Sequence, residues 1–241
     1  MGADQLIVPL GIVGAVILSI LSGKIDRPGG ALGGIMTYLL FLGGGLLGIL
    51  LIGVFFVLGT LASRWKQHQK TAWGVAEDRD GQRGWRNVVA NAGVASLTAA
   101  IVWREPSFVD LGKVVISACF AAALSDTWSS EFGNIYGSKY YHVLTGRKDQ
   151  RGRDGVVSLE GSLAGILGSG VMALLYIADQ GMRYEALVIF IAGVIGNLTD
   201  SVLGATVERK GVVGNHTVNF LNTFVAALLA YFLVKSCSMS S

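Results

Sequence analysis

The sequence predicts an all-α protein, a polytopic bundle of about eight transmembrane helices that forms a single domain over residues 1–241. The chain is 52% hydrophobic and only 15% charged, whereas soluble domains are about 25% charged. Several separate apolar stretches approach or exceed the roughly 17–25 residues that cross a bilayer, which one buried helix of a soluble protein cannot explain. Basic residues also gather in alternating loops. These observations predict an integral, multi-pass membrane protein.

The expected spans follow from the apolar runs in chain order. The first, near 5–23, has no Lys or Arg before it and no small-residue cleavage site, so we expect a retained span rather than a removed signal peptide. The run 31–62 is too long for one ordinary span, and we divide it at Gly43–Gly45. The full set of expected spans is 5–23, 30–44, 46–63, 88–103, 109–125, 157–178, 185–204 and 217–235. Seven spans is the alternative.

Charge predicts the orientation of these spans. With eight spans, the loops after the first, third, fifth and seventh share one side and hold 15 of the 19 Lys and Arg residues. The positive-inside rule places such loops in the cytosol, or on the stroma-equivalent side, with both termini opposite. Anionic lipid headgroups are the ordinary partners of basic residues near spans, and phosphate binding is the alternative. We expect no nucleic-acid partner.

Carboxylates near or within spans form the first candidate site. Asp126 and Glu131 follow an uncharged run in the stretch SDTWSSEFG, Glu160 begins the sixth span, and Asp200 lies within the seventh. An ionised group inside the membrane costs free energy, so such residues occur mainly where they pair with another charge, face a cavity or take part in chemistry. Asp126 and Glu131 are about 140° apart around an ideal helix. Both would meet one ligand only if the helix ended or bent nearby, which Gly133 would allow.

Asparagines at helical spacing form three further polar stripes. The stripes are Asn87 and Asn91 after Arg83, Asn197 beside Asp200, and the set Asn215, Asn219 and Asn222. A single asparagine in a membrane helix usually joins two helices by hydrogen bonds. Three stripes together with several carboxylates favour a binding site.

A basic, glycine-rich loop precedes the sixth span. Its candidate residues are Arg147, Lys148, Arg151 and Arg153, followed by Ser158, Glu160 and Gly161. Such a loop can direct guanidinium groups and backbone N–H groups at phosphate oxygens, although P-loop spacing is absent. Helix capping is the alternative role of Ser158 and Glu160. Carboxylates beside this loop suggest Mg²⁺, which one or two carboxylates commonly hold together with substrate phosphates and water.

The blocks RGWRNVVANAG, LSDTWSSEFG, GVVSLEGSLAG, GNLTDSVLGAT and NHTVNFLNT closely resemble the membrane family that includes plant and cyanobacterial phytyl-phosphate kinase. The Ser-x-Glu-Gly block is more loosely similar to polyprenol and phytol kinases and phosphatidate cytidylyltransferases, which use CTP. The resemblance covers nearly the whole chain. It implies phosphorylation of an isoprenoid monophosphate such as phytyl phosphate to the diphosphate, as in tocopherol biosynthesis, with CTP or another nucleoside triphosphate as donor.

The candidate residues then take expected roles. The expected metal ligands are Asp126, Asp200 and Glu131, and the residues expected to bind nucleotide phosphates are Arg147, Lys148, Arg151 and Arg153. The loop would be shaped by Ser158, Glu160 and Gly161. The nucleotide or the acceptor phosphate would be bound by the asparagines Asn87, Asn91, Asn197, Asn215, Asn219 and Asn222. The glycine-lined bundle would receive the prenyl chain. Two alternatives remain open: a cytidylyltransferase that forms a CDP-lipid, and an ion-coupled transporter, whose site should lie near the midplane.

Overall fold

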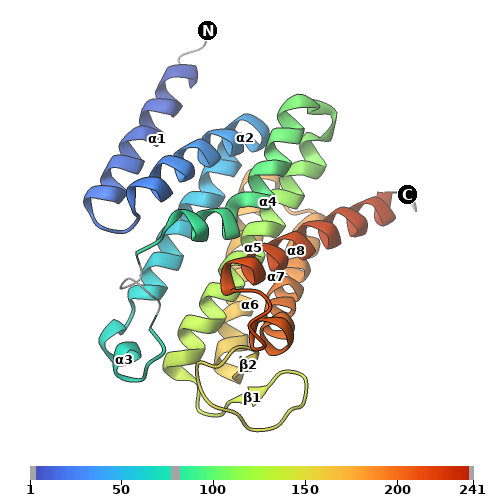
Figure 1. Ribbon diagram of the computed structural model, residues 1–241. Coiled ribbons are helices and arrows are strands. Elements are labelled where there is room, and N and C mark those ends of the chain that lie inside the picture. The colour runs from blue at the N-terminus through green and yellow to red at the C-terminus, as the bar shows by residue number, and fades with distance from the viewer. Residues whose placement is uncertain (1–3, 77–81, 239–241) are drawn as a thin grey trace.

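The computed structural model describes residues 4–76 and 82–238, which form a helical bundle (Figure 1). Its helices are α1 (Asp4–Leu21), α2 (Arg27–Arg64), α3 (Gln67–Ala72), α4 (Trp85–Arg104), α5 (Val109–Tyr136), α6 (Leu159–Gln180), α7 (Tyr184–Leu203) and α8 (Asn215–Ser238). The smaller elements are a 3₁₀ turn (Pro106–Phe108), a π-helical turn (Gly204–Glu208) and the antiparallel strands β1 (Tyr141–His142) and β2 (Val156–Val157).

Within the described residues, five helical segments are long and apolar enough to cross a membrane. They are Arg27–Arg64, Pro106–Tyr136, Leu159–Gln180, Tyr184–Glu208 and Asn215–Cys237, and a shorter apolar helix covers Leu6–Leu21. The all-α membrane bundle predicted from composition is therefore confirmed. The count of eight spans stays a prediction, because α4 is not among these five and α2 is assigned as one helix.

The long helix α2 bends where the sequence predicted a boundary between spans. Gly45 has φ 65° and ψ −150°, a conformation outside the helical region that glycine adopts without a steric penalty. The two halves of α2 run in different directions from this point (Figure 1). They pack closely beside the bend, because a Cβ atom on Gly48 would overlap the carbonyl oxygen of Leu40. Because of this bend, residues 27–64 enter a bilayer as two segments of different direction and not as one straight helix.

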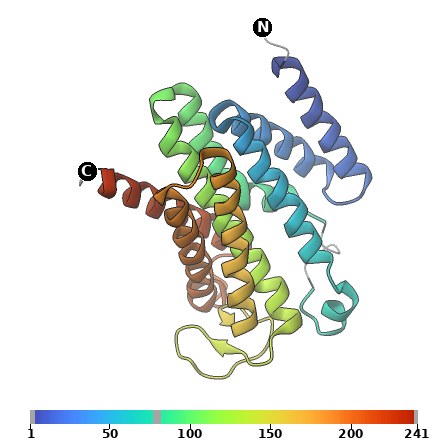
Figure 2. The same ribbon diagram turned by 180° about the vertical axis from the view of Figure 1, so that it is seen from behind.

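Helix α5 is the centre of the bundle, with α2, α4, α6, α7 and α8 packed around it (Figure 2). All residues of Ala118–Leu124 are fully buried. Gly168 of α6 and Gly193 and Gly196 of α7 bring their backbones against this segment, as small residues do between membrane helices. This close packing fixes the orientation of the next turn of α5, which carries Asp126.

The two largest basic loops lie at the same end of the bundle. Helix α3 and the β1–β2 loop mark this end, while the turns between α4 and α5 and between α6 and α7 lie toward the other (Figures 1 and 2). One residue of the predicted basic group, Arg79, lies outside the described residues. The assignment of this end to the cytosol stays a prediction.

Candidate functional site

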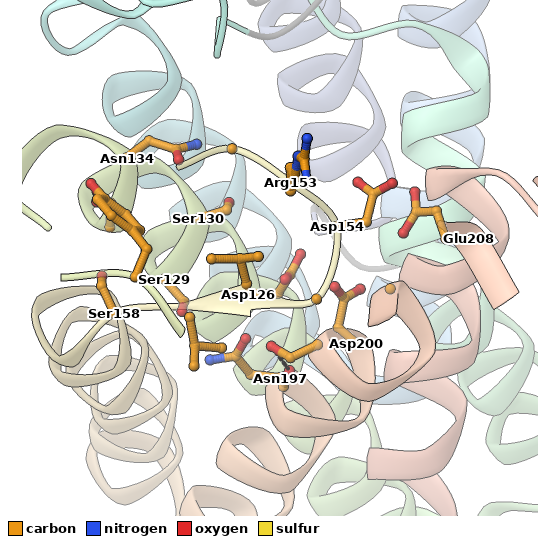
Figure 3. A pocket seen from close by; sticks show the side chains of 18 of the residues that line it. Asp126, Ser129, Ser130, Asn134, Arg153, Asp154, Ser158, Asn197, Asp200 and Glu208 are labelled. Carbon is orange, nitrogen blue, oxygen red and sulfur yellow. Dashed lines mark hydrogen bonds between the residues drawn. The ribbon is translucent and has the colours of Figure 1, made fainter. Parts of the chain in front are cut away.

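A polar cavity of about 220 Å³ lies between α5, α7, the start of α8 and the loop before α6. Its polar lining consists of the carboxylates Asp126, Asp154, Asp200 and Glu208, the side chains of Ser129, Ser130, Asn134, Tyr140, Ser158, Asn197, Ser201 and Asn215, and Arg153. Figure 3 shows these carboxylates around the space below the loop. We call this space the carboxylate cavity.

The carboxylates come from three separate parts of the chain. Asp126 of α5 and Asp200 of α7 have carboxyl groups within hydrogen-bonding reach of each other. Asp154 of the loop and Glu208 of the π-helical turn are close enough to act electrostatically on Asp200 and on each other. Neighbouring carboxylates repel unless a cation or a shared proton lies between them. The cavity is therefore suited to a cation.

Helix α8 orients Asp200 through its asparagine stripe. The Nδ2 atom of Asn222, which is fully buried, donates to Oδ2 of Asp200 at 3.5 Å. With the amide of Asn219 turned so that its nitrogen faces Asp200, that nitrogen donates to Oδ2 at 3.1 Å and to the carbonyl oxygen of Asn215 at 3.2 Å. Asn219 and Asn222 thus position the carboxylate, while Asn215 and Asn197 line the cavity itself.

The loop before α6 reaches the cavity because its backbone touches the end of α7. Gly155 has φ 71°, and a Cβ atom there would overlap Ala205. A Cβ atom on Gly204 would lie 2.8 Å from the backbone nitrogen of Gly155. Gly204 also begins the π-helical turn that ends at Glu208, and such turns are frequent at functional sites. Two glycines and a π-helical turn therefore set the distance between loop and helix.

The four basic residues expected to bind phosphates occupy different places. Arg153 lines the carboxylate cavity, whereas Arg147 and Lys148 are exposed and are not part of its lining. The Nε atom of Arg151 donates to the hydroxyl of Tyr140 at 2.7 Å, and its guanidinium lies 4.2 Å from the ring centroid of Trp73. Arg151 thus holds the loop against the segment after α3, and its predicted role toward phosphate is untested.

An ion pair holds the same loop against the segment after α7. Nη2 of Arg209 lies 2.7 Å from Oδ2 of Asp149, and Nη1 of Arg153 lies 3.5 Å from Oδ1. The hydrogen bond from Arg209, and secondarily that from the N–H of Gln150, lowers the pKa of the Asp149 carboxyl below its ordinary value. The loop is therefore tied to both flanks of the cavity.

Glu131 lies outside the carboxylate cavity and has a cation as its neighbour. Its Oε2 atom lies 2.6 Å from Nζ of Lys70, and the two side chains are 5% and 0% exposed. Nζ of Lys70 also donates to the carbonyl oxygens of Ala62, at 3.2 Å, and Ser63, which end α2. Glu131 thus faces α2 and α3, and the metal role expected for it stays a prediction.

The three residues at the start of α6 join elements together. Ser158 is the N-cap predicted as an alternative, because its Oγ accepts from the N–H of Gly161 at 3.1 Å, and it also lines the cavity. Oε1 of Glu160 accepts from Oγ of Ser138 at 2.6 Å. Gly161 lies against the backbone of α5, where a Cβ atom would be 2.7 Å from the carbonyl oxygen of Ser129.

The residues of the cavity fit Mg²⁺ better than a metal that needs an all-protein cage. Throughout residues 4–76 and 82–238, no group of three or more His, Cys, Asp or Glu side chains is arranged to hold a metal ion. Mg²⁺ is commonly bound by one or two carboxylates, with phosphates and water completing its ligands. Asp126 and Asp200 can supply that pair, with Asp154 and Glu208 close by.

Sequence reasoning missed Asp154, Glu208 and the serines of α5 as cavity residues. A signal for the serines was present, because Asp126, Ser129, Ser130 and Gly133 follow one another at i, i+3, i+4 and i+7 and share a helix face. Asp154 was hidden among the basic residues of its loop. The sequence pattern did not separate Asn87 and Asn91 from the other asparagines, yet these two residues line a second cavity together with Arg83.

Fold and site define an integral, helical membrane protein with a carboxylate-lined cavity closed by a basic loop. The chain belongs to the integral membrane protein family DUF92, whose sequence profile matches residues 10–227.

Three relatives illustrate the spread of this family. The chain is 35% identical over 200 residues to "Protein VTE6, chloroplastic" of Arabidopsis thaliana, covering 78% of this chain and 60% of that protein. An uncharacterized membrane protein of Synechocystis is 37% identical over 193 residues, 76% of this chain and 72% of its own. One of Methanocaldococcus jannaschii is 32% identical over 209 residues, 87% and 85% of the two chains. No solved structure matches the chain.

Proposed function

We propose that this protein is a Mg²⁺-dependent kinase that transfers a phosphoryl group from a nucleoside triphosphate, with CTP as the expected donor, to an isoprenoid monophosphate such as phytyl phosphate. The observation that carries the proposal is the convergence of Asp126, Asp154, Asp200 and Glu208 with Arg153 under a glycine-rich loop. Carboxylates that bind a cation, beside a guanidinium that binds phosphate, are the arrangement that phosphoryl transfer requires. The motif resemblance to phytyl-phosphate kinase supports the same assignment.

The proposed reaction needs no general base. The acceptor is a phosphate monoester, so its oxygen is already anionic and can attack the γ-phosphorus while the bond to the bridging oxygen of the nucleoside diphosphate breaks. Catalysis then depends on positioning and charge neutralisation. Asp126 and Asp200 would hold Mg²⁺, which neutralises phosphate charge when bound. Asn219 and Asn222 keep Asp200 oriented, and Arg153 would bind the nucleotide phosphates.

The decisive assay measures products from purified protein in detergent. Phytyl monophosphate, CTP and Mg²⁺ should yield phytyl diphosphate and CDP, which mass spectrometry resolves. Release of inorganic diphosphate with a CDP-lipid would instead identify a cytidylyltransferase. No turnover with any nucleoside triphosphate, in folded protein and with several chain lengths, would refute the kinase and favour the ion-coupled transporter.

A substitution tests the proposed metal site in the same assay. Asp200→Asn keeps the size and the hydrogen bond from Asn222 but removes the charge, so turnover should fall roughly 100-fold or more while the folded state persists. Asp110→Asn is the matched control, because Asp110 is exposed at the start of α5 and does not line the cavity. Normal turnover and normal Mg²⁺ dependence in Asp200→Asn would exclude this metal site.

A further inference from the structure

A second cavity, of about 430 Å³, lies between α1, both halves of α2 and α4. Its walls are mostly apolar and include Ile12, Val16, Ile52 and Phe56. No described residue lines both this space and the carboxylate cavity. Helix α1 lies at the outer edge of the bundle (Figure 1), so the space borders the region where lipid would be. We call it the α1–α2–α4 groove.

The groove has one polar end, built from Arg83, Asn87 and Asn91. Arg83 is only 5% exposed; its Nη1 donates to Oδ1 of Asn87 at 3.2 Å, and its guanidinium lies 4.9 Å from the ring centroid of Phe55. Its backbone is fixed as well, because its N–H donates to the carbonyl of Lys24 at 3.0 Å. A positive charge is therefore held rigidly at one end of an apolar groove.

Asn91 supplies an independent sign of a ligand. It is 3% exposed, and its Nδ2 donates to the backbone oxygen of Asn87 at 2.9 Å. Its Oδ1 is buried and has no hydrogen-bond partner among the described residues. A buried acceptor without a donor costs about 1–3 kcal/mol, and a water molecule or a ligand group can supply the missing donor. The polar end is suited to a group that carries negative charge and also donates a hydrogen bond.

The size of the groove limits the apolar part of the ligand. An apolar cavity of about 150 Å³ holds one six-carbon ring, so about 430 Å³ corresponds to a single chain of roughly 17 carbons rather than to the two chains of a bilayer phospholipid. A phosphate monoester matches the polar end in its monoanionic form, which has a P–OH donor besides its anionic oxygens; because its second pKa is near 6, about a tenth of the free monoester has this form at pH 7.

The polar end also lies beside the helix turn that carries the carboxylate cavity. A Cβ atom on Gly59 would overlap the Arg83 guanidinium and lie 3.7 Å from Cγ2 of Thr127. Thr127 directly follows Asp126, which lines the carboxylate cavity. We propose that the α1–α2–α4 groove binds the isoprenoid chain of the acceptor, with its phosphate at Arg83, Asn87 and Asn91. This inference rests on the proposed function, since it states where the acceptor lies.

Photo-crosslinking tests the site without requiring turnover. The probe is phytyl monophosphate with a diazirine in its chain, photolysed in detergent with the full-length protein, and labelled peptides are identified by mass spectrometry. Label should map to α1, α2 and α4, and unmodified phytyl monophosphate should compete with it while phosphatidylglycerol does not. Label on α6 to α8 alone, or equal competition by phosphatidylglycerol, would overturn the inference.

Two glycines on α1 provide a matched pair of variants. A Cβ atom at either Gly11 or Gly14 would meet no atom within 4 Å, so a side chain can leave the backbone at both positions without a clash, but only Gly11 lines the groove. Gly11→Leu should reduce labelling and raise the KM for the lipid by about tenfold, leaving the KM for CTP unchanged. Gly14→Leu should change neither value. Equal behaviour of the two variants would contradict the site, and Gly53→Leu, also in open space on the groove wall, repeats the test from α2.

The charge at Arg83 is tested by comparing two probes. Arg83→Met should remove the preference for the phosphate probe over the matching diazirine phytol, and Arg83→Lys should restore part of it. An unchanged preference in folded Arg83→Met would refute the placement of the phosphate. Failure of the inference and failure of the proposed function are separable: specific groove labelling without turnover refutes only the kinase, and turnover without groove labelling refutes only the acceptor site.

Discussion

The buried ion pair between Lys70 and Glu131 allows a quantitative prediction about stability. The two charges are 2.6 Å apart with side chains 0% and 5% exposed. Removal of one partner of a buried pair costs about 3–5 kcal/mol, because the remaining charge stays buried. Lys70→Met should be the more costly change, because Lys70 also donates to the carbonyl oxygen of Ser63, and a buried carbonyl left without a donor costs about 1–3 kcal/mol. The carbonyl of Ala62 would keep the N–H of Trp65 as its donor, at 3.1 Å.

A double-mutant cycle separates this interaction from general damage. We expect Lys70→Met and Glu131→Gln each to lower the thermal midpoint by roughly 10 °C or more, and the double variant to be less destabilised than the sum by at least about 1 kcal/mol. The measurement is thermal unfolding in detergent followed by intrinsic fluorescence. Lys113→Met is the control, because the Lys113–Asp179 pair is 3.5 Å apart and partly exposed, and such pairs contribute about 1 kcal/mol or less.

The same variants distinguish the pairing of Glu131 from the metal role that the sequence suggested. Folded Glu131→Gln should keep a normal Mg²⁺ dependence of turnover, whereas Asp200→Asn should not. Strictly additive stability changes in the cycle would show that Lys70 and Glu131 do not interact. A changed Mg²⁺ dependence of turnover in Glu131→Gln, without loss of stability, would support the predicted metal role of Glu131.

Three further predictions concern the loops. Gly155→Ala should raise the KM for CTP at least about tenfold, because its Cβ would overlap Ala205. Gly146→Ala carries the same left-handed strain of about 1–2 kcal/mol, at φ 63°, but meets open space. It is therefore the control for the contact, its KM for CTP should be nearer the wild-type value, and similar KM values in the two variants would exclude the contact. Because Arg209 lowers the pKa of Asp149, the ion pair between them should persist until the pH falls below about 4. Proteolysis of the loop should therefore accelerate only below about pH 4. The Asp149→Asn variant lacks the ion pair and should be cleaved quickly at every pH. Cysteine labelling should reach α3 and the β1–β2 loop from the cytosolic side only and the α6–α7 turn from the opposite side only, and the reverse pattern would refute the orientation. The labelling variants are His68→Cys, Lys148→Cys and Met182→Cys in a Cys237→Ser background.

The sequence by itself determined the class of fold and several local features. Low charge and repeated apolar runs leave no polar surface for a soluble domain, so the membrane bundle follows from composition. The length of the run 31–62 predicted a division at Gly43–Gly45, where the structure has a bend at Gly45, and the position of Ser158 before a helix gave capping as its alternative role. The sequence also singled out Asp126 and Asp200, since a carboxylate in an apolar segment is conspicuous wherever its helix packs.

Only the tertiary structure decided which of these groups meet. Helical periodicity assigns a residue to a face of its own helix, but the partner of that face depends on how the helices pack. Asp126 therefore meets Asp200, while Glu131, five residues later, meets Lys70. Loop residues have no such periodicity, so Asp154 reaches the cavity through the tertiary contacts of its loop, among them the backbone contact between Gly155 and Gly204.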